Sequence, residues 1–191
     1  EKVITPLLEK ALGVHCFTHN QFDTDVLGTF SGEIERTLDP ISTLRKKCQL
    51  AMEMSNCDLG IASEGSFGSH PSMFFAPADD ELLIFIDSKN DFEIISRELS
   101  TNTNLNGKYI SNEMELLSFA EKALFPSHAL ILRKDKDENN DIHKGIAHFA
   151  ELKSTFEKLL DKYKSVYIET DMRAMYNPTR MSVIETAAEK L

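Results

Sequence analysis

Four acidic side chains are candidates for binding a cation. Asp23, Asp25 and Glu33 lie in a stretch from 19 to 39 without apolar periodicity, and Glu64 follows a short apolar run. Hard divalent cations bind several carboxylate oxygens that converge from separate segments. The pattern therefore predicts a magnesium site formed by Asp25, Glu33 and Glu64. Loop carboxylates also serve as solvated caps and turn formers, which is the alternative.

The segment around Glu64 is the strongest single candidate for a site. The run 58–63 is typical of a buried strand, and 64–71 is rich in residues that favour a turn. Clefts in α/β sheets form at the carboxyl ends of strands, and glycine lets a backbone approach a ligand closely. We therefore expect Glu64 to be catalytic. Its neighbours are expected to bind ligand, namely Ser63, Gly65 and Ser66. A plain tight turn is the alternative.

Three basic residues are candidates for holding a phosphate group. Lys47 lies beside the apolar stripe of a predicted helix, and we expect a catalytic role in which it offsets charge on a phosphoryl group. Arg173 follows a predicted strand and Arg180 opens a predicted helix, whose N-terminal amides favour anions. We expect both arginines to bind ligand. The structural alternative pairs Asp171 with one of these arginines and makes Asn177 an ordinary helix cap.

Two of the six histidines lie beside prolines in polar segments, His70 before Pro71 and His128 after Pro126. Imidazole titrates near neutral pH, so both are candidates for acid–base chemistry. Histidines in such positions also cap helices or pack in the core, and this alternative stays open. The histidines lack the HExxH spacing of a zinc site, so zinc is disfavoured.

These candidates need a framework of helices and strands. Helical spacing of apolar residues predicts helices at 3–12, 40–56, 111–124 and 149–163, and a last one that begins after Asn177. Strands are predicted at 14–18, 58–63, 82–87, 92–99, 129–133 and 166–170. The sequence thus predicts a single α/β domain over 1–191, with a mixed twisted sheet flanked by helices. A two-lobed fold with a central cleft is also compatible with this order of elements.

Composition limits the partners. The 191 residues are 41% hydrophobic, enough for one packed core, and carry a formal net charge of −10, which repels nucleic acid and anionic lipid. We expect no nucleic-acid and no membrane partner, because no apolar run approaches the roughly 20 residues that cross a bilayer. A small phosphorylated ligand is compatible with this net charge.

Three cysteines without a CxxC pair favour a reducing, cytoplasmic location. The opening residues lack a signal-peptide pattern and begin as if a strand preceded them.

Five segments spread along the chain together resemble one family: FDTDVLGTF, ASEGSFGSHP, FPSHALILR, HKGI and YIETDMRAMYNPTRM. The resemblance is to an uncharacterised bacterial family, one of the domains of unknown function, and it covers nearly the whole chain. It implies a common fold and no particular activity.

A fainter similarity is to the inosine triphosphate pyrophosphatase superfamily. It rests on the order Asp23-Thr24-Asp25, Thr29-Phe30, Glu33, Lys47-Cys48 and Glu64, with Asp25 where the superfamily has glycine. The resemblance implies a two-lobed α/β fold that hydrolyses non-canonical purine triphosphates with magnesium. It also implies metal roles for Glu33 and Glu64 and a phosphate role for Lys47.

Two functional hypotheses follow. The first is a magnesium-dependent phosphohydrolase that acts on a nucleotide, with metal-held water as the nucleophile. The alternative is a non-catalytic module that binds a small ligand or regulates through it, on the same fold. A third possibility, a structural partner protein, would be favoured by a large exposed apolar patch.

Overall fold

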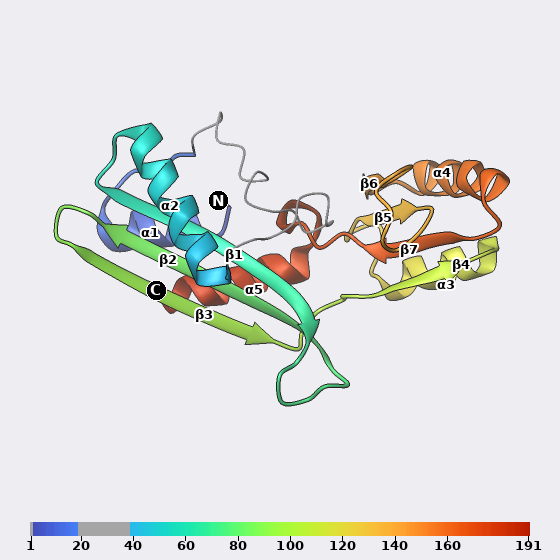
Figure 1. Ribbon diagram of the computed structural model, residues 1–191, viewed down its shortest axis with the longest axis horizontal. Coiled ribbons are helices and arrows are strands. Elements are labelled where there is room, and N and C mark those ends of the chain that lie inside the picture. The colour runs from blue at the N-terminus through green and yellow to red at the C-terminus, as the bar shows by residue number, and fades with distance from the viewer. Residues whose placement is uncertain (1, 19–38) are drawn as a thin grey trace. The chain divides into compact units, whose positions relative to one another are not determined.

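In the computed structural model, residues 2–18 and 39–191 are described, and they divide into two compact units. The first unit comprises residues 2–18, 39–103 and Met181–Leu191, and the second comprises Asn104–Arg180. Each unit has its own sheet (Figure 1). The candidate residues are therefore held by two separate frameworks.

The first unit is a three-stranded antiparallel sheet with helices packed against it. Its elements are α1 (Ile4–Leu12), α2 (Pro40–Ser55), β1 (Leu59–Ser69), β2 (Pro77–Asp87), β3 (Phe92–Ser100) and most of α5 (Pro178–Glu189). The strand order is β1-β2-β3. On one face, Leu44 and Cys48 of α2 pack against Leu82 and Ile84 of β2. The opposite face meets α5, where the Ser96 hydroxyl donates a 2.7 Å hydrogen bond to the Ala187 carbonyl.

Local chemistry explains where α1 ends and where α2 begins. The Asp39 carboxylate accepts the N–H groups of Ile41 and Ser42 at 3.1 Å, so it caps α2, and Pro40 fills the first turn. Gly13, with φ of 65°, ends α1 in the left-handed conformation that glycine adopts without strain. The cap fixes the start of the helix that carries Lys47.

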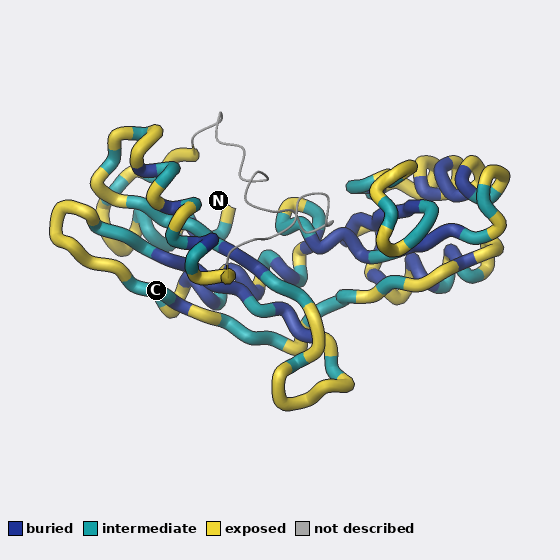
Figure 2. Tube along the Cα trace, in the orientation of Figure 1, coloured by how far each residue is buried: buried dark blue, intermediate teal, exposed yellow. Residues whose placement is uncertain are grey.

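The second unit is a four-stranded antiparallel sheet with two helices on one face. Its elements are β4 (Gly107–Ile110), α3 (Glu113–Lys122), β5 (Leu130–Arg133), β6 (His143–Ile146), α4 (Phe149–Lys162), β7 (Val166–Thr170) and a 3-10 turn (Ala174–Tyr176). The strand order is β4-β7-β5-β6. Phe119 of α3 and Phe156 of α4 share one core with Leu132 and Ile168, which are cross-strand partners and so point to the same face. Figure 2 shows this core as buried chain.

The predicted α/β class is confirmed, as are the helices from 40, 111 and 149 and the strands 129–133 and 166–170. The pairing found is antiparallel throughout the described strands. Two predictions are wrong. The segment 14–18 is not a strand, and 64–69 is not a turn, because β1 continues through Glu64 to Ser69 in register with β2. Within residues 2–18 and 39–191, no helix is long and apolar enough to cross a bilayer.

Close packing of α2 on β1 depends on Gly60. A Cβ atom at this position would lie 2.4 Å from Met52 Cγ and 2.8 Å from Cys48 Sγ, both on α2. We expect Gly60→Ala to lower the free energy of unfolding by about 1–3 kcal/mol through overpacking. Gly68→Ala is the matched control on the same strand, because a Cβ atom there meets nothing within 4 Å. Urea unfolding of the two variants tests this, and equal losses would contradict it.

Candidate functional site

The first unit brings together Lys47 of α2 and Glu64 of β1. The Lys47 ammonium donates a hydrogen bond to Glu64 Oε2, and the two form an ion pair. Only 14% of the Lys47 side chain and 2% of the Glu64 side chain are exposed. The two residues predicted to be catalytic are thus in contact, although they lie 17 residues apart in the sequence.

Secondary structure explains why this pair forms. Glu64 is opposite Leu82 in the β1–β2 register, so its side chain lies on the face that α2 covers. Lys47 precedes Cys48, a buried residue of the apolar stripe of α2, and therefore lies at the edge of that stripe. A carboxylate with almost no contact with water requires a cation or hydrogen-bond donors, and the Lys47 ammonium provides both.

Beside this pair is a cavity of about 730 Å³, which we call the apolar cavity. Its wall combines α1 and the segment after it with α2 and β1. Its apolar lining is Ile4, Leu8, Leu12, Val14, Phe17, Ala51, Met52, Leu59, Ile61, Ala62 and Phe85. Lys47 and Ser63 also line it, so the predicted ligand-binding residue Ser63 lies at a hollow. Gly65 and Ser66 are instead strand residues paired with Glu81 and Asp80.

Two of the thiols in the first unit have raised pKa values. Cys16 and Cys57 line the apolar cavity, and all three cysteines are free. Burial and the nearby Glu9 carboxylate raise the pKa of Cys16. Burial raises the pKa of Cys48 to about 12. A nucleophilic cysteine needs a lowered pKa, so the structure gives no support to thiol catalysis at Cys16 or Cys48.

The predicted magnesium site does not form from the described part of the chain. Asp25 and Glu33 lie outside the described residues, and Glu64 is engaged with Lys47. Within residues 2–18 and 39–191, no three His, Cys, Asp or Glu residues group closely enough to hold a metal ion. The described residues therefore do not fit magnesium by themselves.

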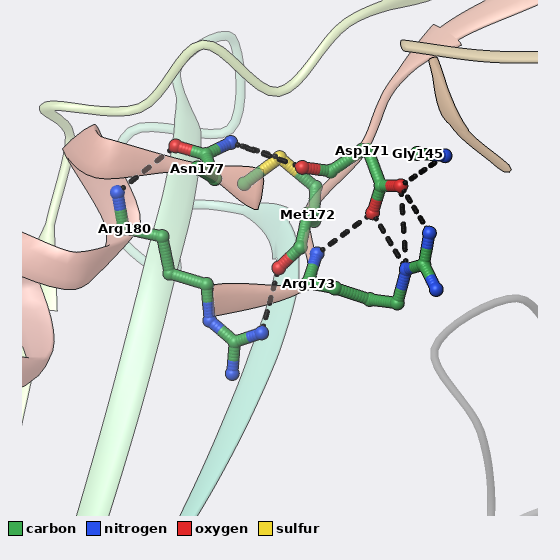
Figure 3. A network of polar contacts seen from close by, with 6 residues as sticks. All are labelled: Gly145, Asp171, Met172, Arg173, Asn177 and Arg180. Atoms are coloured by element: carbon green, nitrogen blue, oxygen red, sulfur yellow. Dashed lines mark hydrogen bonds and ion pairs between the residues drawn. The ribbon is translucent and has the colours of Figure 1, made fainter. Parts of the chain in front are cut away.

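The second unit holds the predicted arginines in a polar network after β7 (Figure 3). Asp171, fully buried, accepts the N–H of Gly145 at 3.0 Å and the backbone N–H of Arg173 at 3.1 Å. The Arg173 guanidinium donates to both oxygens of the same carboxylate, with Nη2 at 2.6 Å. It also stacks over the Tyr176 ring, 4.5 Å from the centroid. Arg173 thus fixes the turn after β7.

Asn177 and Arg180 complete this network. The Asn177 side-chain oxygen accepts the Arg180 backbone N–H at 3.0 Å, so Asn177 is the helix cap considered in the structural alternative. Arg180 Nη1 donates to the Met172 carbonyl at 2.6 Å, and Arg180 is 6% exposed. These contacts favour a structural role for Asp171 and Asn177. The predicted ligand-binding residues are divided between the two units.

His128 holds the N-terminus of α5. Its Nε2 accepts the Thr179 backbone N–H at 3.2 Å and lies 2.8 Å from the Thr179 hydroxyl. We assign the ring proton to Nδ1, which then donates to Ser127 Oγ at 3.0 Å, and that hydroxyl donates to the Leu124 carbonyl. Of the two sequence-based interpretations of His128, this geometry fits the capping role.

The apolar cavity was not predicted from the sequence, because nine of its 21 lining residues come from α1 and the segment after it. The only sequence signal was the apolar spacing of Ile4, Leu8 and Leu12, of which only Ile4 is buried. A helix whose apolar face is incompletely buried indicates either a partner or a hollow, and the sequence alone does not distinguish them.

Comparison with known families supports one assignment. Residues 47–191 match the family model described as a domain of unknown function, DUF6671. The chain belongs to the DUF6671 family. The DUF6671 match begins at Lys47 and so includes both members of the buried pair, whereas Asp25, Glu33 and α1 precede it. No curated protein and no solved structure matches the chain.

We expect the buried pair of this DUF6671 chain to act as a unit in stability. Lys47→Met leaves a buried carboxylate without its cation, and Glu64→Gln leaves a buried ammonium without its anion. Each change should cost about 3–5 kcal/mol of unfolding free energy. The double variant should lose clearly less unfolding free energy than the two single variants together, because it leaves no buried charge without a partner. Urea unfolding of the four proteins measures this coupling.

Arg45→Met is the matched control for that cycle. Arg45 lies on the same helix and pairs with Glu93 at 2.6 Å, but both side chains are more than a third exposed. Arg45→Met should lose much less unfolding free energy than Lys47→Met, because water screens an exposed pair. Additive losses in the cycle, or equal losses at Arg45 and Lys47, would contradict a buried coupled pair.

Stability of the second unit should fall in mild acid through His128. Burial lowers the pKa of His128 from its ordinary value of 6.5. Below pH 6.5 the unfolded chain therefore binds a proton that the native imidazole resists, so the free energy of unfolding declines as the pH falls through that value. His128→Gln keeps a hydrogen-bond acceptor and should remove this part of the pH dependence. Urea unfolding between pH 7.5 and 5.5 measures the difference, and identical slopes for both proteins would refute it.

Proposed function

We propose that this chain is a small-ligand-binding module whose site is the apolar cavity of the first unit. The observation that supports this most is the cavity itself, about 730 Å³ and lined largely by apolar side chains with few polar groups. Ligand sites in proteins fall at about 300–1,000 Å³ and have this kind of lining. The free thiols support the expectation of a cytoplasmic protein.

The lining indicates the class of ligand. Lys47 lines one wall, and its ammonium has three donors, one of which it gives to Glu64. The remaining donors suit an oxygen-bearing head group such as a carboxylate, sulfonate or phosphate. The rest of the wall suits an apolar body, because burying it removes hydrocarbon surface from water. We therefore propose a molecule with an apolar body and a single oxygen-bearing head.

A fluorescent probe of this chemistry tests the proposal. Anilinonaphthalene sulfonate combines an apolar ring system with one sulfonate, and we expect saturable binding to the native chain with slower labelling of Cys16 and Cys57 by a thiol reagent. Ala51→Phe places a ring in the cavity and should weaken binding at least about tenfold, the effect of losing one well-buried apolar contact.

Met54→Phe is the matched control for that substitution. Met54 lies on the same helix, is 44% exposed and does not line the cavity, so the change should leave binding unaltered. Equal binding by the native chain and Ala51→Phe, or unchanged thiol labelling with bound probe, would refute binding in the cavity.

A magnesium-dependent nucleotide phosphohydrolase is the second candidate, supported by the contact between Lys47 and Glu64. It requires Asp25 and Glu33, which lie outside the described residues, to bring further carboxylates to Glu64. Release of phosphate or pyrophosphate from inosine or guanosine triphosphate, dependent on magnesium and abolished by Glu64→Gln, would favour it over simple binding. Stabilisation by a ligand without turnover favours the binding module.

A further inference from the structure

The hairpin between β1 and β2 ends in a loop, residues 70–76, that presents two phenylalanines to solvent. Phe74 is 79% exposed and Phe75 is 90% exposed. Met73 beside them is also exposed. We call this segment the aromatic loop; it extends beyond the end of the sheet of the first unit and is almost entirely exposed (Figures 1 and 2). Exposed apolar groups gathered in this way mark a contact surface.

The backbone of the aromatic loop is held by its own hydrogen bonds. The His70 N–H donates to the Ala76 carbonyl and the Ala76 N–H donates to the Met73 carbonyl, both at 2.8 Å. His70 Nδ1 accepts the N–H groups of Ser72 and Met73, both at 3.1 Å. Four backbone donors are thus satisfied within the loop. Such a loop needs few hydrogen bonds from its surroundings, which matters in a medium that offers none.

The end of this hairpin carries no formal charge. From Gly65 to Ala78 there is no Asp, Glu, Lys or Arg, although 27% of the whole chain is charged. His70 is the one histidine in this stretch, and its Nδ1 is the acceptor of the two hydrogen bonds within the loop. An uncharged tip avoids the desolvation cost that keeps charged groups out of apolar media.

The first charges below the tip are neutralised or buried. Asp79 is fully buried, and Asp80 forms a two-fold pair with Arg97 at 2.7 Å. Asp80 lies three residues below Pro77, where β2 begins, which places it about 10 Å from the base of the loop. This spacing equals the Debye length of about 8–10 Å. The charged residues that follow the loop in β2 are therefore buried, paired or largely screened at its base.

We infer that the aromatic loop inserts into the interface of a lipid bilayer and anchors the protein there reversibly. Two phenylalanines offer about 300–500 Å² of surface, less than the roughly 800 Å² per partner of a stable protein interface. A bilayer accepts a few apolar side chains without such a surface. This contact is interfacial and revises the expectation of no membrane partner. It is independent of the apolar cavity, whose lining contains no loop residue.

A single-tryptophan variant tests the inference, because the chain has no tryptophan of its own. Phe75→Trp should show a blue-shifted emission on addition of phosphatidylcholine vesicles, and lipids brominated on the acyl chain should quench it. Phe92→Trp is the matched control, since Phe92 is also exposed in the first unit but lies outside the loop, and it should not respond.

Co-sedimentation with the same vesicles measures the strength of the contact. Phe74→Ser/Phe75→Ser should weaken it at least about tenfold, and Phe92→Ser should leave it unchanged. Binding should vary little with salt, because the driving force is apolar burial. A Phe75→Trp emission maximum that does not change on addition of vesicles would overturn the inference. So would a blue shift that appears without lipid and grows with protein concentration, which would indicate docking on a second copy of the chain.

Discussion

Burial of the Glu64 carboxylate is the constraint on which the first unit depends. A carboxylate with 2% of its side chain exposed requires a cation or hydrogen-bond donors, and the Lys47 ammonium on the neighbouring helix provides both. The pair therefore fixes the register of β1 and the rotation of α2 together. A one-residue shift in the register of β1 would turn the Glu64 side chain to the opposite face of the sheet. Both charges would then lack a partner. Gly60 allows the close helix–strand approach that the pair requires.

The two units treat their charged residues differently. In the second unit, Asp171 is surrounded by donors from Gly145 and Arg173, so its network is closed on itself and acts as a scaffold. In the first unit, Lys47 gives one donor to Glu64 and also lines a hollow. This difference is why the binding proposal rests on the first unit. A polar network whose hydrogen bonds are made within the network helps to specify a fold. A hydrogen-bond donor at a cavity wall can instead bind a ligand.

Local signals in the sequence predicted the helices well, whereas the strands β4 and β6 were not predicted. The cap at Asp39 and the proline after it marked the start of α2, and helical spacing placed Lys47 beside the buried stripe. The sequence singled out Lys47 and Glu64 separately as candidate catalytic residues, and the structure brings the two into contact. The strand through Glu64 was missed because glycine and serine are typical of turns, while pairing with β2 decides its conformation. Cross-strand register is a long-range property that local composition does not contain.

The proposed binding site needs one direct observation: a crystal structure of the chain with anilinonaphthalene sulfonate bound. The account predicts density for the aromatic rings between α1, α2 and β1, with the sulfonate within hydrogen-bonding distance of Lys47 Nζ and the contact from Lys47 to Glu64 retained. Density for the probe at any other place, with the apolar cavity unchanged, would contradict it.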